Sequence, residues 1–374
     1  MNKTKILYSI RQIDFGGGET HLDYILNSLP ENYEPILLTL SKSYYYQRFV
    51  SKGIKIYSIN RNSPLSIVTI YKVTKLIKEN RIDIIHAHGT KGALAILIPS
   101  LLTKTKFIYT VHSFSFHPGI NYLSYIIRRQ IEKLITLFAT LIIFVSKTDF
   151  EKANFVNPQK KVLIPNAIDT GRFCPSDDKS LRNKLGFTEN DFVIALIGRI
   201  TFQKNPFFAI EVIEKLNSLR ENSSNNLQYK LLVVGEGELK ESLIKRVKER
   251  SLEKFVKFID FRPDVEYILN SIDCLILPSF WEGMPYILLE AMACAVPVVA
   301  SNLKSIEEVI TSGENGFCED IKDIDNFVKM IKDLASNKEL YHHISEKARL
   351  TITQKFDVKL MMNDLFQLYK NVNK

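Results

Sequence analysis

Residues 282–301 read Glu282-Gly-Met-Pro-Tyr-Ile-Leu-Leu-Glu290-Ala-Met-Ala-Cys-Ala-Val-Pro-Val-Val-Ala-Ser301 and carry two carboxylates eight positions apart. The segment before them, 274–278, is Cys-Leu-Ile-Leu-Pro, and this short apolar run predicts a buried parallel strand that ends in a turn. Proline is tolerated in the first turn of a helix, so Pro285 marks a helix start. The pattern therefore predicts that Glu282 precedes a helix and that Glu290 lies inside it.

The turn that enters this helix is a candidate anion site. The first backbone N–H groups of a helix have no partner within the helix, and they sit at the positive end of its dipole. Here they belong to the residues around Gly283, Met284 and Tyr286. A carboxylate pair at this spacing also arises by chance in unrelated helices, so the interpretation depends on support from the rest of the chain.

Short apolar segments alternate with helical patterns along the whole chain, which predicts parallel sheets covered by helices. A chain of 374 residues is long enough for two domains. The expected strands are residues 5–10, 34–39, 55–58, 82–87, 106–111, 141–145 and 161–164 in the first half, and 192–197, 230–234, 256–259, 274–277 and 296–300 in the second half. We predict an α/β protein with two doubly wound, Rossmann-like domains, residues 1–165 and 166–356.

Charge is unevenly distributed along the chain. Residues 1–168 hold 22 Lys and Arg against 10 Asp and Glu, whereas residues 169–374 hold 28 against 31. A basic first half suits an anionic membrane surface, a diphosphate-bearing acceptor or nucleic acid, or it is simply solvated; no nucleic-acid motif accompanies it. Segment 123–137 alternates basic residues, among them Arg128, Arg129 and Lys133, with apolar ones, which is typical of an interfacial helix and of an ordinary amphipathic core helix.

Location and metal binding follow from what the sequence lacks. No apolar run approaches the roughly 20 residues of a membrane-spanning helix, and the start of the chain has no apolar core of signal-peptide length, so we expect a cytoplasmic protein. The four cysteines are far apart and form no Cys-x-x-Cys pair, which favours reduced thiols over disulfides or zinc. His86 and His88 are two apart on an expected strand and could share a metal, but no third ligand is evident, so no metal site is expected.

Two further motifs suit phosphate. A glycine run, Asp14-Phe-Gly16-Gly17-Gly18-Glu19, follows the first strand, and such a turn lets backbone approach a ligand, although it is also an ordinary tight turn. It matches neither the dinucleotide-binding nor the Walker pattern. Later, Gly198-Arg199 ends a strand and Lys204 follows, which places a forked hydrogen-bond donor and a point charge where a diphosphate could bind.

In their order along the chain, these motifs resemble those of the family 4 retaining glycosyltransferases, which have the GT-B fold of two Rossmann-like domains facing across a cleft. The motifs that carry the resemblance are Glu282-x7-Glu290, the Gly16 to Glu19 loop, Gly198-Arg199-x4-Lys204, the Gly235-Glu-Gly237 turn and His112 at a strand end. The family commonly has glycine at four positions where this chain has Ala167, Asp260, Ala295 and Ser305. The two alanines are small enough to fit if the backbone φ is negative at their positions, while Asp260 leaves the contacts to the nucleotide base open.

The resemblance implies a role for each matched residue. Arg199 and Lys204 neutralise the leaving diphosphate, so that no metal or other cofactor is required. Glu282 and the adjoining N–H groups hold the donor sugar, Glu290 accepts hydrogen bonds from the ribose, and His112 orients an outer sugar hydroxyl. The implied catalytic residues are Glu282, His112, Arg199 and Lys204, and the implied donor-binding residues are Gly16, Gly17, Gly198, Arg199, Lys204, Gly283, Met284, Pro285, Tyr286 and Glu290. The last helix, 357–374, is expected to pack back onto the first domain.

The implied activity is retaining transfer of a hexosyl-type sugar from a nucleotide diphosphate sugar, with a UDP-sugar favoured, to a hydroxyl group. The expected acceptor is a glycan or a polyprenyl-diphosphate-linked glycan used in cell-surface polysaccharide synthesis, such as lipopolysaccharide or capsule. We expect it to dock on the basic first domain, with the enzyme peripheral at the inner face of the plasma membrane. Two alternatives remain: a GT-B sugar-nucleotide epimerase, which needs no acceptor, and a catalytically silent nucleotide-sugar-binding module.

Overall fold

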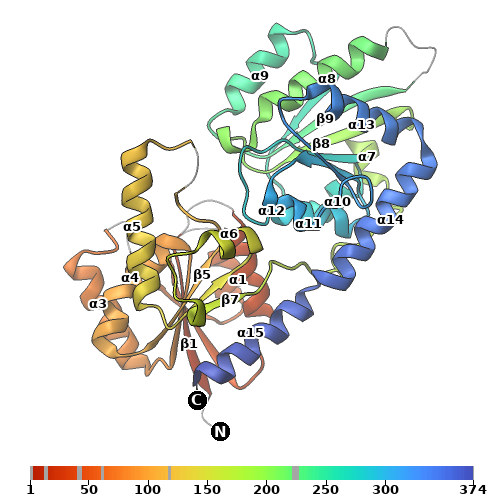
Figure 1. The fold of residues 1–374 in the computed structure, drawn as a ribbon. Coiled ribbons are helices and arrows are strands. Elements are labelled where there is room, and N and C mark those ends of the chain that lie inside the picture. The colour runs from red at the N-terminus through yellow and green to blue at the C-terminus, as the bar shows by residue number, and fades with distance from the viewer. Residues whose placement is uncertain are drawn as a thin grey trace. The chain divides into compact units, whose positions relative to one another are not determined.

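A computed structural model describes residues 3–11, 16–39, 44–59, 63–116, 119–220 and 227–373, without the side chains of residues 44, 45, 47 and 220. The chain divides into two compact units. The first contains Met1–Asn166 with Val358–Lys374, and the second contains Ala167–Asp357. Each unit is built on one sheet covered by helices (Figure 1), and the α/β prediction is confirmed.

The first unit has a seven-stranded sheet in the order β3-β2-β1-β4-β5-β6-β7, and all neighbouring strands are parallel. Its strands are β1 Thr4–Ile10, β2 Tyr33–Thr39, β3 Lys55–Ser58, β4 Ile84–His88, β5 Lys106–Val111, β6 Leu141–Phe144 and β7 Lys161–Leu163. Its helices are α1 Gly17–Ser28, α2 Tyr44–Ser51, α3 Ile67–Asn80, α4 Gly89–Thr103, α5 Tyr122–Phe138, α6 Lys147–Lys152 and α15 Val358–Asn373, with a 3₁₀ turn, η1, at Pro158–Lys160.

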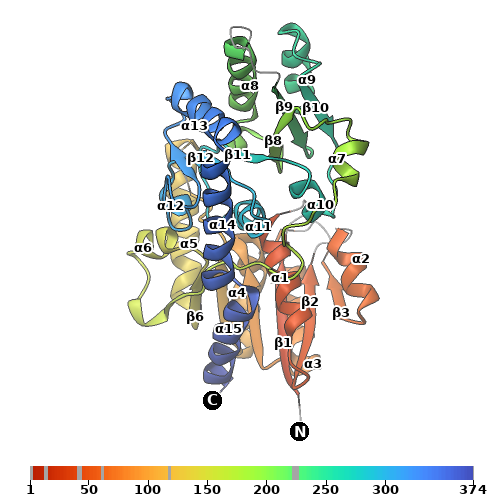
Figure 2. The same cartoon turned by 90° about the vertical axis from the view of Figure 1, so that its right-hand side faces the viewer.

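Alternating side chains of the central strands serve two helical layers. Leu7 of β1 and Ile85 of β4 belong to a buried apolar cluster that also contains residues of α3, α4 and α5. The next residues along these strands, Tyr8 and His86, contact Tyr369 of α15: the Tyr8 hydroxyl donates to the Tyr369 hydroxyl at 3.3 Å, and His86 Nδ1 lies 2.6 Å from the same oxygen. Because α15 also contacts α1, the last helix is an integral part of the first unit (Figure 2).

The second unit has a six-stranded parallel sheet in the order β10-β9-β8-β11-β12-β13. Its strands are β8 Asp191–Ile197, β9 Gln228–Val234, β10 Val256–Ile259, β11 Cys274–Leu277, β12 Val298–Ser301 and β13 Phe317–Glu319. Its helices are α7 Ser180–Lys184, α8 Pro206–Arg220, α9 Lys240–Glu249, α10 Val265–Leu269, α11 Tyr286–Ala293, α12 Lys304–Glu307, α13 Ile324–Ser336 and α14 Lys338–Lys355, with a 3₁₀ turn, η2, at Phe202–Lys204.

Several strand bounds differ from the sequence prediction by one or two residues, among them the starts of β4, at Ile84, and of β9, at Gln228. β12 begins at Val298 instead of Val296, because the Val296 N–H donates back to the Ala291 carbonyl at the end of α11 and Pro297 has no N–H to give to a neighbouring strand. β13 was not predicted. It contains only three residues, Phe-Cys-Glu, none of them fully buried, so it has no continuous apolar run to identify it.

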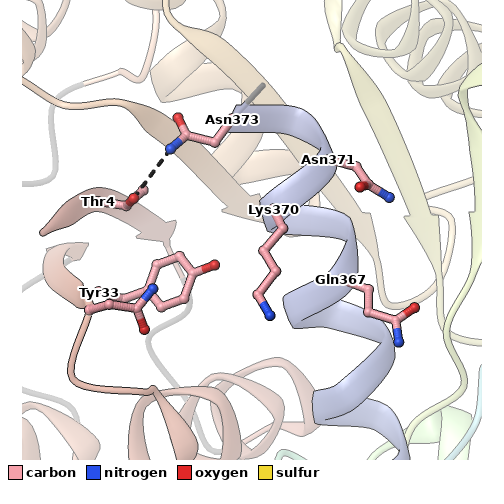
Figure 3. A pocket seen from close by; sticks show the side chains of 7 residues that line it. Thr4, Tyr33, Gln367, Lys370, Asn371 and Asn373 are labelled. Atoms are coloured by element: carbon pink, nitrogen blue, oxygen red, sulfur yellow. Dashed lines mark hydrogen bonds between the residues drawn. The ribbon is translucent and has the colours of Figure 1, made fainter.

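None of the helices in the described part of the chain has both the length and the apolar character needed to cross a membrane. A pocket of the first unit lies between α15 and the first residues of β1 and β2, Thr4 and Tyr33 (Figure 3). Asn373 of α15 donates to the Thr4 hydroxyl across it at 3.2 Å. Ligands of parallel α/β sheets bind outside the carboxyl ends of the strands, so this pocket at the amino ends is not where we expect catalysis.

Candidate active site

The predicted catalytic residues of the second unit lie in two segments that leave neighbouring strands. β8 pairs with β11, and because both are parallel, the loops after them emerge at the same edge of the sheet. The first loop contains Arg199 and Lys204, and the second contains Glu282. Lys204 Nζ lies 2.6 Å from Glu282 Oε1, and these side chains are only 13% and 7% exposed. The structure therefore joins two predicted catalytic residues in one largely buried ion pair.

Arg199 is connected to this pair through a residue that the sequence did not single out, Gln203. The exposed Arg199 donates from its guanidinium to Gln203 Oε1 at 3.3 Å. The Gln203 amide donates to the Trp281 carbonyl at 2.8 Å and lies 3.4 Å from Glu282 Oε2. Gln203 thus fixes the two loops to each other, and as an uncharged residue in a loop it gave no sequence signal.

The glycines around this edge have a packing role. Gly198 and Gly235 both have positive φ angles, and a Cβ atom on Gly235 would collide with the Gly198 carbonyl oxygen. A Cβ atom on Gly237 would collide in the same way with the carbonyl of Ile200. Glycine here lets the loops after β8 and β9 pack backbone to backbone, which fixes the position of the strand end that carries Arg199.

α11 begins close to where the sequence predicted. Pro285 is its N-cap rather than a first-turn residue, so Gly283 and Met284 lie just before the helix and Tyr286 is its first residue. Glu290 lies inside the helix, as expected. Although part of the residue is exposed, enclosure of its carboxyl group raises the pKa of Glu290 to about 7, an effect that Arg172 opposes and Glu266 reinforces.

Ala295 does not meet the condition of a negative φ under which an alanine fits this position without strain. Its φ is +56°, in the left-handed region, because the N–H groups of Ala295 and Val296 fold back onto the carbonyls of Met292 and Ala291 to end α11. An L-residue other than glycine is strained in this conformation. Ala167 has a φ outside the left-handed region and meets the condition.

The other two departures from the family pattern have contacts of their own. The Ser305 hydroxyl donates to the Glu282 carbonyl at 2.9 Å, so a side chain that glycine lacks helps to hold the loop that carries Glu282. Asp260, by contrast, is an exposed residue whose carboxylate lies 2.6 Å from Lys240 Nζ.

In the first unit, the glycine run forms the start of α1. Gly16 is the N-cap, with an extended backbone, and its carbonyl accepts from the N–H groups of Glu19 and Thr20. Gly17 is the first helical residue. Asp14 and Phe15 lie outside the described residues.

His112 belongs to a cluster of four histidines, which we call the histidine cluster: His21, His86, His88 and His112. His86 uses both ring nitrogens, toward Tyr369 and toward the Thr110 hydroxyl at 2.6 Å, which fits a structural role. His88 Nδ1 lies 3.2 Å from His112 Nε2, and the His21 ring packs edge-on against His112 with centroids 5.0 Å apart.

Burial and mutual repulsion keep the histidine cluster uncharged. Burial lowers the pKa of His21 to about 4, with a hydrogen bond to Asn166 acting in the opposite direction. The pKa values of His86, His88 and His112 are lowered in the same direction, first by burial and then by the neighbouring histidines. Within the described ranges, no group of three or more His, Cys, Asp or Glu side chains has an arrangement that could hold a metal ion.

A buried carboxylate on α5 connects the first turn of α4, the strand β5 and the loop that follows β5. Glu132 accepts hydrogen bonds from Thr90 at 2.6 Å, Tyr109 at 2.9 Å and Ser115 at 3.1 Å. Thr90 comes two residues after His88, and Ser115 comes three residues after His112. The sequence offered no signal for this residue, because the contact joins segments that are distant along the chain.

Comparison with known proteins agrees with the motifs. Residues 15–172 match the model described as Glycosyltransferase Family 4, and residues 177–351 match the one described as Glycosyl transferases group 1. The chain is 29% identical over 313 residues to the Escherichia coli UDP-Gal:alpha-D-GlcNAc-diphosphoundecaprenol alpha-1,3-galactosyltransferase, covering 81% of this chain and 78% of that protein. It is 24% identical to the Bacillus anthracis N-acetyl-alpha-D-glucosaminyl L-malate synthase, covering 97% and 91%.

Solved structures share the fold. Anabaena HepE in complex with UDP and glucose superposes with a TM-score of 0.86 at 21% identity, covering 98% of this chain and all of the other. Sucrose-phosphate synthase from Thermosynechococcus elongatus gives 0.80 at 16% identity, covering 99% of both. With two matched family models side by side along its length and the fold of these enzymes, the chain belongs to the family 4 glycosyltransferases of the GT-B type.

Proposed function

We propose that this glycosyltransferase moves a sugar from a UDP-sugar to a hydroxyl of a lipid-linked glycan, with retention of the anomeric configuration and without a metal ion. The observation that carries the proposal is the buried Lys204–Glu282 pair beside Arg199 and the entry to α11. It offers fixed positive charge and an acceptor for sugar hydroxyls within one short stretch of surface.

The charges of this site suit a diphosphate leaving group. Lys204 has three N–H donors and gives one to Glu282, so two remain for phosphate oxygens. Arg199 is exposed and makes one long hydrogen bond, which leaves most of its fork for a phosphate. Preorganised donors aimed at developing negative charge typically supply about 3 to 4 kcal/mol each, and a helix N-terminus adds to them. This is why we propose catalysis without a divalent ion.

The two carboxylates are assigned to different parts of the donor. Glu282, next to Lys204, is assigned to the transferred sugar. Glu290 lies in the second turn of α11 and is assigned to the ribose, whose hydroxyls donate more strongly to the ionised carboxylate than to the neutral acid. His112 is assigned to an outer hydroxyl of the sugar. For the retaining step we propose that a leaving phosphate oxygen takes the proton of the acceptor hydroxyl.

Several relatives support the substrate classes. The name of the Escherichia coli relative specifies a UDP-sugar donor and a diphosphoundecaprenol acceptor, other relatives are named for O-antigen biosynthesis, and HepE was crystallised with UDP-glucose. A thermal-shift screen against UDP-, GDP- and ADP-sugars should show stabilisation by UDP-sugars, because a ligand that binds only the folded state raises the melting temperature.

The enzymatic test is transfer to a short-tailed GlcNAc diphosphate in excess chelator, with the anomeric configuration of the product read by NMR. We expect unchanged turnover and a retained configuration. An inverted product, or activity that returns only with a divalent metal, would contradict the corresponding part of the proposal. Interconversion of sugar nucleotides without acceptor would indicate an epimerase, and tight binding without turnover would indicate a silent binding module.

We further propose that α5 docks on an anionic membrane. Its apolar residues Leu123, Ile127, Leu134 and Leu137, which we call the α5 stripe, repeat every three or four positions with Gln130 among them, so they share one face. They are 67%, 50%, 47% and 65% exposed, whereas the opposite face buries Glu132, Ile135 and Thr136. The α5 helix is coloured yellow-orange in Figure 1.

Basic charge beside the α5 stripe favours an anionic lipid surface over another occupant. On a helical projection, Lys133 lies beside one edge of the stripe, and Arg129 lies further round on the same side, against the Phe155 ring. Both belong to the half of the chain with 22 basic against 10 acidic residues. An apolar face with basic charge along its edge is typical of an interfacial helix. Sedimentation with phosphatidylglycerol vesicles should be lost in Leu123→Asp/Ile127→Asp and should weaken with salt. Equal binding to neutral vesicles, or dimers that dissociate in the variant, would contradict membrane docking.

A further inference from the structure

Beside the Lys204–Glu282 pair lies a group of three aromatic side chains, Phe202, Phe280 and Trp281, which we call the aromatic platform. The Phe202 and Phe280 rings stack with centroids 4.8 Å apart and an interplanar angle of 26°. The Trp281 ring lies 6.1 Å from that of Phe202. Phe202 is 60% exposed, whereas Phe280 and Trp281 are half-buried, so the Phe202 ring is the part of the platform that faces solvent most.

Hydrogen bonds hold the platform in place without a ligand. The Phe280 N–H donates to the Gln203 carbonyl at 2.9 Å, and the Gln203 side-chain amide donates to the Trp281 carbonyl at 2.8 Å. The two loops that carry the rings are therefore fixed to each other at the residue next to Phe202. A preformed surface loses little conformational entropy when a ligand binds.

The surroundings of the platform are polar and planar. Gln203 contacts Trp281, Glu282 and Arg199, so amide, carboxylate and guanidinium groups lie around the rings. An alkyl chain offers these groups no further hydrogen bonds, whereas a sugar ring has an apolar C–H face that can lie on an aromatic ring and a rim of hydroxyls for such partners. The chemistry thus fits a pyranose ring better than a lipid tail.

We infer that the aromatic platform is the subsite for a pyranose ring of the acceptor. The inference rests on the proposed function, which assigns the adjacent Glu282 and Lys204 to the donor sugar and its phosphate. The platform is tied to Glu282, at the entry to α11, and not to Glu290 in the second turn of the helix, which is assigned to the ribose. The ring that lies on the platform is therefore next to the reacting sugar.

The sequence provides a direct reporter, because Trp281 is the only tryptophan of the chain. The probes are three diphosphates with the same short alkyl tail, carrying GlcNAc, glucose or galactose, and the tail diphosphate without sugar. With UDP bound, we expect at least one sugar-bearing probe to change Trp281 emission and the sugar-free probe to leave it unchanged. Equal responses to all probes, or no sugar-dependent response, would overturn the inference.

Variants separate aromatic stacking from simple apolar contact. Phe202→Leu should weaken binding of the responding probe roughly tenfold and raise its KM while kcat stays within a factor of two, whereas Phe202→Tyr should keep wild-type affinity. Tyr267→Ala removes another exposed aromatic of the same unit, 52% exposed, and should change neither value. Wild-type affinity in Phe202→Leu would overturn the inference.

UDP binding, measured by calorimetry in the same variants, separates the two proposals. We expect it to be unchanged by Phe202→Leu. If the wild-type protein does not bind UDP, the proposed function itself is contradicted. If it binds UDP but its Trp281 emission does not depend on the sugar of the probe, only the inference about the aromatic platform is contradicted. An emission change caused by UDP-sugar as large as that caused by the probe would assign the platform to the donor and overturn the acceptor assignment.

Discussion

Breaking the Lys204–Glu282 pair from one side should cost about as much stability as removing both charges together. The two side chains are 13% and 7% exposed, so either charge alone would be left in a poorly solvated site. At about 4 Å between charge centres and an effective dielectric constant near 20, their attraction is about 4 kcal/mol. Removing one partner of a buried pair typically costs about 3 to 5 kcal/mol.

The variants are Lys204→Met, which keeps the apolar stem of the side chain, Glu282→Gln, and the double variant. We expect each single change to lower the free energy of unfolding by about 3 kcal/mol, and the double change to lower it by about 2 to 3 kcal/mol less than the sum of the two. Urea unfolding followed by Trp281 emission is the assay, because this only tryptophan of the chain adjoins Glu282.

The exposed pair Lys245–Glu249 of α9 provides a matched control. Its atoms are 3.7 Å apart, and its side chains are 78% and 54% exposed. Water screens such a pair, so Lys245→Met should change stability by less than about 0.5 kcal/mol. Additive effects of Lys204→Met and Glu282→Gln, or single effects as small as that of the control, would refute the coupling.

Three further predictions concern the supporting structure. Ala295→Gly should raise stability by about 1 kcal/mol in urea unfolding, because it relieves a φ of +56°; a lower midpoint would contradict the strain. Ser305→Ala removes the hydroxyl that donates to the Glu282 carbonyl and should lower stability by about 1 kcal/mol and reduce kcat, unlike Ser218→Ala at an exposed position of α8. A drop from pH 7.5 to pH 5 should destabilise the protein, because His21 is protonated near pH 6.5 in the unfolded state but only near its pKa of about 4 in the folded state. At pH 5 this difference lowers the free energy of unfolding by about 2 kcal/mol. A pH dependence of stability that is the same in His21→Asn would contradict this prediction.

The fold was predictable because its strands are short apolar runs separated by turn residues. β3, β5, β10 and β11 have the predicted bounds, and a buried parallel strand requires such a run on both faces. β13 was missed because its three residues form no pattern. The start of β12 was misplaced because the helix before it ends in a backbone turn that propensity does not reveal.

The sequence predicted only those residues of the candidate site whose position after a strand indicates their role. Arg199, Lys204 and Glu282 stand at strand ends, and parallel strands bring their carboxyl ends to one edge. Gln203 and Glu132 act through contacts with distant segments, so no local pattern marks them.

The sequence left open whether α5 is an interfacial or a core helix. In the structure, the polar residues Glu132 and Thr136 face the interior. Glu132 can be buried because neighbouring hydroxyl groups donate hydrogen bonds to its carboxylate. The α5 stripe faces solvent.

The central claim is that Arg199 and Lys204 recognise the diphosphate of the donor. The most direct test is the ratio of the affinities for UDP and for uridine, measured by calorimetry for the wild-type protein, Arg199→Ala and Lys204→Met. Each charge-assisted contact is worth about 1.5 to 3 kcal/mol, so each variant should reduce the preference for UDP roughly 10- to 100-fold and leave uridine binding unchanged. A preference for UDP that is the same in all three proteins would contradict the claim.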